Sequence, residues 1–305
     1  MNDITCLKIQ LMCVIVDITV NKTRLKGDMF MKKAICMVMA VLTLMLTLGA
    51  CAEKEPEINT ENLPAITVGV TKGKSPQDEV IYGLELHFPE YGYKLEYKEY
   101  DNGKQALEAL EKGEIDFSLI ATKKDYTEYG SEALANMGPV YFYPMAIYLK
   151  TWDKVANIED GATIALPDDA ENMARALLLL EENGYITLKE GAGLEAKLED
   201  VEKNERGFEL KAVAHNEVAS SGADIFVMGS LEASASGYER GFDAYVSETT
   251  DSEAAALYAT SFIIRKADLK TEKMNLIEKY FFTRRMYQAI DGSTDNIIQP
   301  MFSLK

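Results

Sequence analysis

The sequence predicts an α/β protein of two lobes, each a mainly parallel sheet flanked by helices. Short β-branched runs alternate with segments whose apolar residues recur at helical spacing, which is the pattern of βαβ units. The alternation occupies 65–120 and resumes in 163–264, and two lobes joined by crossing segments fit this better than one sheet. A ligand is then expected in the cleft between the lobes, near strand ends and helix N-termini.

The first part of the pattern has clear boundaries. The expected elements are a strand at 65–70, a helix at 77–88, a strand at 93–100, a helix at 105–112 and a strand at 115–120. The first strand is rich in β-branched residues, and the second alternates between charged and apolar or aromatic residues. Gly113 ends the second helix, because glycine readily adopts the left-handed conformation that follows a helix C-terminus.

The second part of the pattern shows the same alternation of strands and helices. The expected elements are a strand at 163–167, a helix at about 170–183, strands at 223–228 and 261–264, and a long terminal helix at 272–290. Gly184 stops the first of these helices. The strand at 223–228 carries no charge after Asp224, which is typical of a central strand buried on both faces.

Charge and cysteine content restrict the class of protein. With 49 acidic and 32 basic residues the formal net charge is −17, which argues against a nucleic-acid partner, since phosphates require a basic surface. All four cysteines lie early, at positions 6, 13, 36 and 51. If the chain is cleaved before Cys51, one thiol remains. An internal disulfide and a CxxC zinc site are then impossible, and the apolar core must hold the fold.

The segment before Cys51 has the features of a secretory leader. Met31 and two lysines precede an apolar stretch of roughly 15 residues, which is shorter than the roughly 20 residues of a membrane span. The stretch ends in Leu-Gly-Ala-Cys51, which looks like a bacterial lipobox. We expect cleavage before Cys51, acylation of its thiol, and anchoring to the extracytoplasmic face of the cell membrane. An uncleaved anchor helix is the alternative.

These observations divide the chain into five parts. We expect an upstream extension at 1–30, a lipoprotein signal peptide at 31–50, a tether at 51–64, a first lobe at 65–142 and 259–305, and a second lobe at 143–258.

Several stretches resemble the methionine-binding lipoproteins, the NlpA and MetQ type of substrate-binding protein. Residues 137–148 read MGPVYFYPMAIY and residues 158–169 read IEDGATIALPDD, close to VGPVHIEPMGIYS and DLPDGATIAIPND in that family. The similarity covers essentially Ile66 to the C-terminus. It implies a periplasmic-binding-protein fold of type II-like architecture that closes on a small solute and delivers it to an ABC permease, without a cofactor and without catalysis.

The resemblance also indicates which residues face the solute. Asn172 and Arg175 match the family motif NDPTNGGRAL, in which Asp168 stands for the first asparagine. Three other places depart from the family. The segment 119–126 lacks the histidine and the aromatic residues of the family motif FFQHKPYLD, the segment 228–231 reads MGSL in place of INGN, and Thr260 replaces an asparagine. The implied ligand site is Thr122, Tyr143, Asp168, Asn172, Arg175, Met228 and Thr260. The solute is expected to be an amino acid or a related organic anion, with methionine among the candidates.

Arg175 has two interpretations. A guanidinium near a helix N-terminus is a good site for a carboxylate. The acids Asp168, Asp169 and Glu171 crowd the same turn, however, and could cap the helix and pair with Arg175 at the surface. Residue types alone favour this second interpretation, and the family resemblance favours ligand contact. Tyr143 is similarly open between packing at a hinge and stacking on a ligand.

Other functions find less support in the sequence. His87 and His215 are the only histidines, and neither stands beside a cysteine or an acidic ligand pattern, so they are expected to be surface or core residues. No serine lies in the G-x-S-x-G frame of a nucleophile elbow. An enzyme on the same fold is therefore a weak alternative. A lipoprotein that has diverged toward sensing or adhesion is the stronger one.

Overall fold

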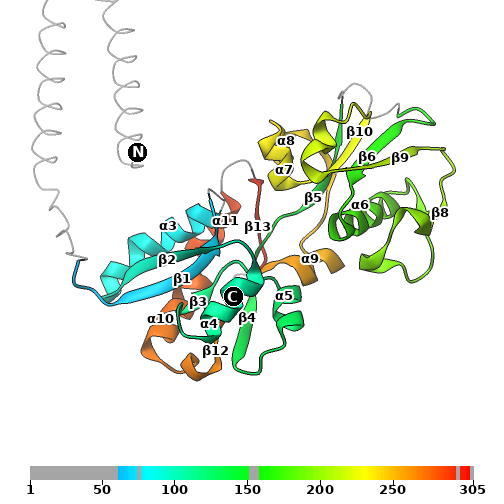
Figure 1. Ribbon diagram of the computed structural model, residues 1–305. Helices are drawn as coiled ribbons and strands as arrows, with labels where there is room; N and C mark the ends of the chain where they lie inside the picture. The colour runs from blue at the N-terminus through cyan, green and yellow to red at the C-terminus, as the bar shows by residue number, and fades with distance from the viewer. Residues whose placement is uncertain (1–60, 74–76, 151–157, 293–295, 303–305) are drawn as a thin grey trace, which may run out of the picture. The chain divides into compact units, whose positions relative to one another are not determined.

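The computed structural model describes residues 61–73, 77–150, 158–292 and 296–302. They belong to the compact unit Asn59–Lys305, which contains two large sheets (Figure 1). The expected extension, leader, lipidation site Cys51 and most of the tether lie outside the described residues. Within the described ranges no helix is both long and apolar enough to cross a bilayer.

The first sheet contains strands from both ends of the unit. Its order is β13 (Gln299–Pro300), β4 (Leu134–Phe142), β12 (Thr260–Arg265), β3 (Phe117–Ser118), β1 (Ala65–Thr71) and β2 (Lys94–Tyr100). The strands β2, β1 and β3 are parallel, as expected for βαβ units, whereas β12, β4 and β13 run antiparallel to their neighbours. Its helices are α3 (Gln77–His87), α4 (Gly103–Glu111), α5 (Lys123–Tyr129), α10 (Glu272–Phe281) and α11 (Arg284–Asp291). We call this sheet with its helices the first lobe.

The second sheet is built from the middle of the chain. Its order is β11 (Ala244–Ser247), β5 (Met145–Leu149), β10 (Ile225–Gly229), β6 (Thr163–Pro167) and β9 (Glu209–Val213). The strands β10, β6 and β9 are parallel, and β5 and β11 are antiparallel. With α6 (Ala170–Glu182), α7 (Ser230–Ala235), α8 (Arg240–Asp243) and the small sheet of β7 (Thr187–Leu188) and β8 (Val201–Lys203), it forms the second lobe. The expected central position of the 223–228 strand is confirmed.

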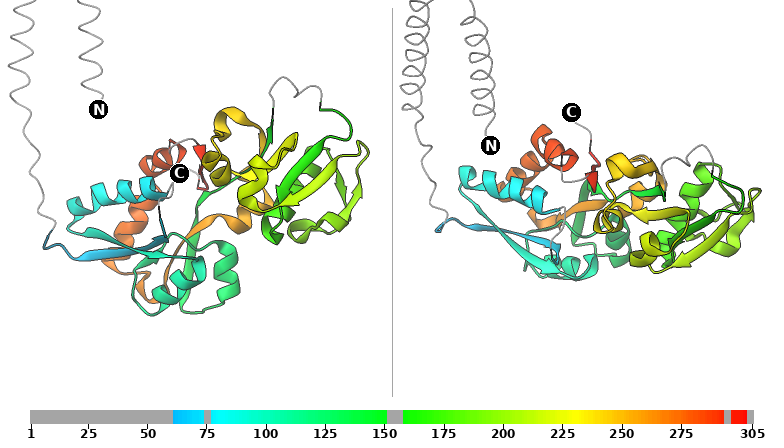
Figure 2. Two further views of the ribbon diagram at one scale, coloured as in Figure 1. Left: turned by 45° about the horizontal axis from the view of Figure 1, so that its top comes forward. Right: turned by 90° about the horizontal axis from the view of Figure 1, so that it is seen from above.

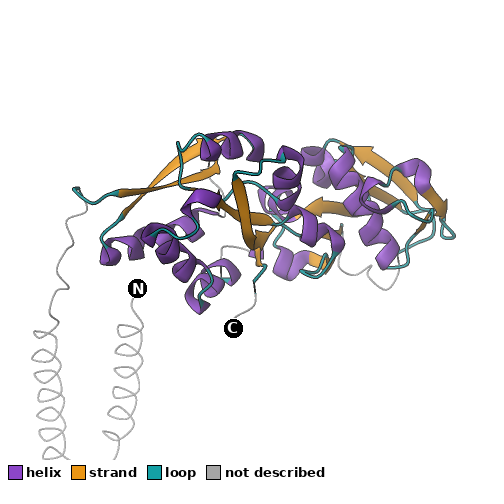
Figure 3. Cartoon of the chain, turned by 90° about the horizontal axis from the view of Figure 1, so that it is seen from below, coloured by secondary structure: helices purple, strands orange, loops and turns teal. Residues whose placement is uncertain are grey.

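Alternating side chains place a separate apolar core on each face of each sheet. In the first lobe, alternate residues of β1 pack under α3 and α10, and α4 covers the opposite face. In the second lobe, α6 covers one face of the sheet and α7 covers the other. Figure 3 shows helices on both sides of the strands in both lobes. Because buried apolar area supplies most of the folding free energy, each lobe has its own source of stability.

The lobes are joined by segments that pass directly from one sheet to the other. Strand β4 of the first sheet leads through Tyr143 and Pro144 into β5 of the second sheet, and this crossing is visible in Figures 1 and 2. The return path leads from β11 through α9 (Glu253–Tyr258) into β12. A third contact comes from the C-terminal segment, where Ser230 Oγ on α7 donates to the Ile297 carbonyl at 2.6 Å. The expectation of two lobes joined by crossing segments is confirmed.

One expected helix is wrong. The single terminal helix at 272–290 is two helices, α10 and α11, separated at Phe282 and Thr283. Phe282 leaves the helical conformation with φ −100° and ψ 37°, and its ring packs edge-on against Phe262 and Phe302. Thr283 then caps the second helix by accepting a hydrogen bond from the Met286 amide at 3.2 Å. Local capping and ring packing therefore override the continuous helical spacing.

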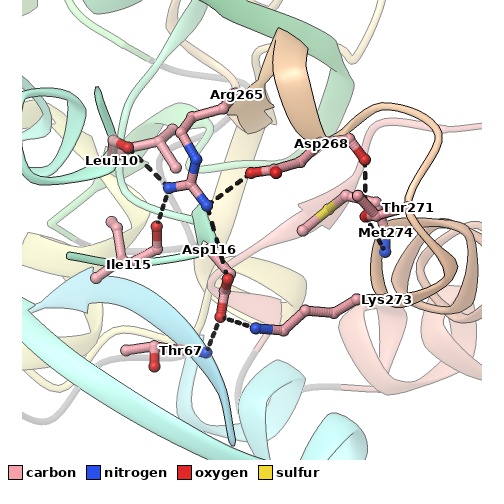
Figure 4. Close-up of polar contacts among 9 residues, drawn as sticks. All are labelled: Thr67, Leu110, Ile115, Asp116, Arg265, Asp268, Thr271, Lys273 and Met274. Carbon is pink, nitrogen blue, oxygen red and sulfur yellow. Dashed lines mark hydrogen bonds and ion pairs between the residues drawn. The ribbon is translucent and has the colours of Figure 1, made fainter. Parts of the chain in front are cut away.

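A polar network ties the late strand β12 to the early elements of the first lobe (Figure 4). Arg265 donates to the Leu110 carbonyl at 2.9 Å and to the Ile115 carbonyl at 2.5 Å. The carboxylate of Asp116 accepts from Lys273 at 2.6 Å and lies 3.7 Å from Arg265. Because the Ile115 carbonyl is engaged by a side chain at one end, and the Ile120 amide donates to Ser118 Oγ at 3.4 Å at the other, the expected strand at 115–120 contracts to β3.

Candidate functional site

Helix α6 begins where the sequence predicts, because Asp169 caps it. The Asp169 side chain accepts a hydrogen bond from the Asn172 amide at 3.0 Å and a second from the Asn172 side-chain amide at 3.2 Å. The N-terminal turn thus has an acceptor for one of its free N–H groups. This start places Arg175 in the second turn, where its side chain is buried with only 7 % of its surface exposed.

The guanidinium of Arg175 is held by a carboxylate far away in sequence. Its Nε and Nη2 donate to the two oxygens of Glu248 at 3.1 and 2.6 Å, which is a bidentate pair. Nη2 also donates to the Tyr143 carbonyl at 2.9 Å, and Nη1 donates to Asn172 Oδ1 at 3.3 Å. Four of the five N–H groups therefore have acceptors among the described residues, and one on Nη1 remains for a ligand oxygen.

This pair also connects the two crossing segments. Glu248 follows β11 on the return path, and its Oε2 accepts from the Met145 amide at 2.7 Å on the outgoing path. The rings of Phe142 and Tyr258, one from each path, lie 5.2 and 5.6 Å from the guanidinium carbon of Arg175. A buried cation flanked by two aromatic rings, with its charge balanced by Glu248, thus lies where the lobes meet.

On the first-lobe side, Thr122 and Thr260 lie next to each other. Their backbones form an isolated antiparallel bridge, and Thr122 caps α5 through a reciprocal capping box with Asp125. The buried Thr260 hydroxyl hydrogen-bonds the phenol of Tyr141, which also donates to the Leu119 carbonyl at 3.0 Å. Burial raises the pKa of Tyr141 well above its ordinary value, so this phenol stays a neutral donor.

The two sides are linked at Tyr143 and at α5. The ring of Tyr143 packs edge-on against Tyr141 with centroids 5.6 Å apart, while its carbonyl accepts from Arg175. Lys124 of α5 reaches Glu171 of α6, with 3.0 Å between Nζ and Oε2. The hydrogen bond to Glu171 raises the pKa of Lys124. Burial and the charge of Glu171 raise the pKa of Tyr258.

Comparison with known proteins identifies the family. The family model described as NlpA lipoprotein matches residues 66–302. The chain belongs to the NlpA lipoprotein family.

Individual relatives agree with this assignment. The uncharacterized lipoprotein YhcJ of Bacillus subtilis is 32 % identical over 201 residues, covering 65 % of this chain and 69 % of the relative. The probable D-methionine-binding lipoprotein MetQ of Pasteurella multocida is 27 % identical over 260 residues, covering 82 % and 92 %. A solved ABC transporter periplasmic substrate-binding protein from Coxiella burnetii shares the fold, with a TM-score of 0.60, 22 % identity and coverage of 77 % and 99 %.

In this NlpA lipoprotein, five of the seven expected site residues are connected by contacts, with Tyr141 as the link between the two sides: Thr122, Thr260, Tyr143, Arg175 and Asn172. The structure does not bring the other two into it. Asp168 is exposed. Met228 is 1 % exposed and packs in the core under α7, on the sheet face opposite α6. Ligand contact by any of the seven remains a prediction.

The surface-pair interpretation of Arg175 is wrong. Its carboxylate partner is the buried Glu248, and neighbouring Asp169 caps the helix instead. No local pattern points to Glu248, which is 73 positions from Arg175 and one of 49 acids. Lys124 and Tyr258 were missed for the same reason, since both come from other elements. The structure of this NlpA lipoprotein places His87 in the core, stacked on Tyr280, and His215 at the surface.

Proposed function

We propose that this NlpA lipoprotein is the substrate-binding protein of an ABC importer and captures a small solute between its lobes. The observation that carries the proposal is the buried guanidinium of Arg175 at the meeting point of the lobes, with one N–H unclaimed among the described residues. The fold shared with a solved substrate-binding protein and the similarity to a probable D-methionine-binding lipoprotein support it.

The chemistry of the site favours a solute with a carboxylate and an apolar or polarisable body. Because Glu248 neutralises Arg175 and occupies its Nε–Nη2 edge, a ligand carboxylate would accept from Nη1, beside the Asn172 amide. The ring of Tyr258, 5.6 Å from the guanidinium carbon, is an apolar surface close to that position, and the buried ring of Phe142 supports the guanidinium from within. An amino acid or a related organic anion satisfies both requirements, and methionine fits because its thioether packs well against aromatic rings.

The remaining assignments follow from this role. We propose the lobe bounds 65–142 with 259–305 and 143–258, supported by the distribution of strands between the two sheets. We also propose that acylated Cys51 holds the chain to the extracytoplasmic face of the cell membrane, next to the permease that receives the solute. Anchoring matches the description of the family as lipoproteins, and delivery to a permease matches the similarity to an ABC transporter substrate-binding protein.

A thermal-shift experiment on the full-length chain in detergent tests the proposal. The panel is L- and D-methionine, other amino acids, dipeptides and small organic anions. A true ligand at a hundred times its Kd should add about 2.7 kcal/mol to the free energy of unfolding. Stabilisation by one or a few carboxylate-bearing compounds supports the proposal. If no compound of the panel raises the unfolding temperature, the proposal is contradicted.

A paired substitution tests the assigned site. The double variant Arg175→Gln with Glu248→Gln removes both buried charges together, so it leaves no unpaired ion in the interior. We expect it to lose the ligand-induced shift. The matched control is Arg206→Gln with Asp160→Asn, an ion pair of 2.7 Å whose acid is 78 % exposed. An unchanged shift in the Arg175 and Glu248 double variant would remove Arg175 from the ligand site.

A further inference from the structure

One ion pair between the described residues connects the two lobes, and it is Lys124 with Glu171. Every other ion pair in the described ranges joins residues of a single lobe. We propose that Lys124 and Glu171 form an interlobe latch: a positioning pair that stabilises the arrangement in which the lobes meet over the Arg175 site. The existence of the latch does not depend on the proposed function. Its use in ligand binding rests on that function.

The position of Lys124 is difficult to explain within its own lobe. It lies in the first turn of α5, where the positive end of the helix dipole disfavours a cation. Its ammonium contacts Glu171 at 3.0 Å and the ring of Tyr258 at 5.4 Å, which belong to the second lobe and to the return path. Within its own helix the charge of Glu128 makes a smaller contribution than the hydrogen bond to Glu171. The direct contacts of this ammonium therefore exist only while α5 lies against α6 and α9.

Glu171 is well placed on its side of the contact. It lies in the first turn of α6, where the helix dipole favours an acid, and Asp169 already caps that helix. Capping therefore does not require Glu171, so its carboxylate is available to Lys124. The pair joins the N-terminal turns of two helices that come from different lobes, one turn away from the buried guanidinium of Arg175.

The contact is weak enough to be reversible. The four larger apolar clusters each belong to one lobe. Among the described residues, only a small fifth cluster joins the crossing segments, where Phe142 packs against Ala254, Ala255 and Tyr258 of α9. The side chains of Lys124 and Glu171 are 36 % and 40 % exposed, so water and salt screen their attraction. A screened ion pair can bias the spacing of the lobes without locking it.

The test measures the spacing of the lobes in the absence of any ligand. Spin labels are attached through ketone-bearing non-natural amino acids at positions 98 and 203 of the full-length chain. Both positions are exposed, on β2 of the first lobe and β8 of the second. In Lys124→Met and in Glu171→Gln, the population with long interlobe distances should rise about two- to fivefold, as expected for a partly exposed pair.

The charge swap separates a pair effect from a local defect. Lys124→Glu combined with Glu171→Lys should return the distance distribution to that of the unaltered chain. Asp160→Asn, which breaks an ion pair inside the second lobe, should not change it. Single variants without effect, or a swap that fails to restore the distribution, would overturn the latch. This distance measurement uses no ligand. It can therefore be interpreted even if no compound of the thermal-shift panel stabilises the chain, a result that would contradict the proposed function alone.

Discussion

At Arg175, burial and charge balance depend on one another. The guanidinium and the carboxylate of Glu248 are 8 % and 5 % exposed as side chains, and an ion deprived of its partner in such a place remains poorly solvated. Either residue alone is therefore harder to replace than both together. The site can lose its cation only if it loses the acid as well.

We accordingly predict that Arg175→Met alone lowers the free energy of unfolding by about 3–5 kcal/mol, since the buried carboxylate of Glu248 then keeps the Met145 amide but loses its opposite charge. Adding Glu248→Gln should recover most of that loss. Urea unfolding of the two variants beside the unaltered chain measures the difference. Equal losses in the single and double variants would show that the charge of Glu248 is satisfied elsewhere.

Tyr129 provides a pH-dependent contact in the first lobe. Its hydroxyl donates to Glu111 at 2.6 Å, and that hydrogen bond, with smaller contributions from burial and the acid's charge, raises the pKa of Tyr129 to about 12. The pKa of Glu111 is lowered by its hydrogen bonds from Ser131 and Tyr129. The raised pKa stabilises the fold fully below pH 10, the ordinary tyrosine value, and this contribution disappears as the pH rises through about 12.

In Glu111→Gln the pKa of Tyr129 should fall back toward 10. An absorbance titration should then show one more phenol ionising between pH 10 and 12 than in the unaltered chain. Glu128→Gln, an exposed acid next to Tyr129 in sequence, is the control and should leave the titration unchanged. An unaltered titration in Glu111→Gln would show that the hydrogen bond does not set this pKa.

At the scale of elements, the break between α10 and α11 shows how little is needed to divide a helix. Phe282 and Thr283 are the only two residues between them, and no proline or glycine marks the place. The break is maintained by one capping hydrogen bond and by the rings around Phe282.

We predict that Thr283→Ala lowers the free energy of unfolding by about 1 kcal/mol, the usual cost of losing an N-cap side chain. Thr283→Ser retains the hydroxyl and should lose much less. Thermal or urea unfolding distinguishes them. If serine costs as much as alanine, the methyl group of Thr283 is responsible and not its cap.

Periodicity and capping residues predicted most elements because those signals are local. The helix after Pro167 begins at its aspartate cap as expected, and the strands around 65–70, 93–100, 163–167, 223–228 and 261–264 are present. What failed depended on distant partners. The strand at 115–120 is shortened where Arg265 binds a carbonyl, and Glu248 could not be paired with Arg175 because their contact spans 73 positions.

At the scale of the whole molecule, the second lobe is contained within the first in sequence. All strands of its sheet lie between Met145 and Ser247. The first sheet, in contrast, includes β12 and β13 from the end of the chain. Strand β12 lies between β3 and β4, so without it the first sheet falls into two pieces. No described strand of the second sheet comes from later sequence, although Ser230 of α7 hydrogen-bonds the Ile297 carbonyl.

A chain ending at 258 should therefore keep the second lobe and lose the first. In hydrogen exchange, the amides of β6 and β10 should remain protected while those of β1 exchange rapidly, because β1 loses the core that Phe262 and α10 supply. The full-length chain is the reference. Loss of protection in β6 as well would show that the two lobes unfold as one cooperative unit.

Strand β2, at the outer edge of the first sheet, affects whether two copies of the chain can associate through their sheets. Among the described strands β2 pairs with β1 alone, so its other side presents unpaired backbone groups to which a second strand could add. Its sequence, Lys94-Leu-Glu-Tyr-Lys-Glu-Tyr100, places charges along that side, and desolvating them opposes strand addition. This charged border therefore opposes edge-to-edge addition between two copies of the chain.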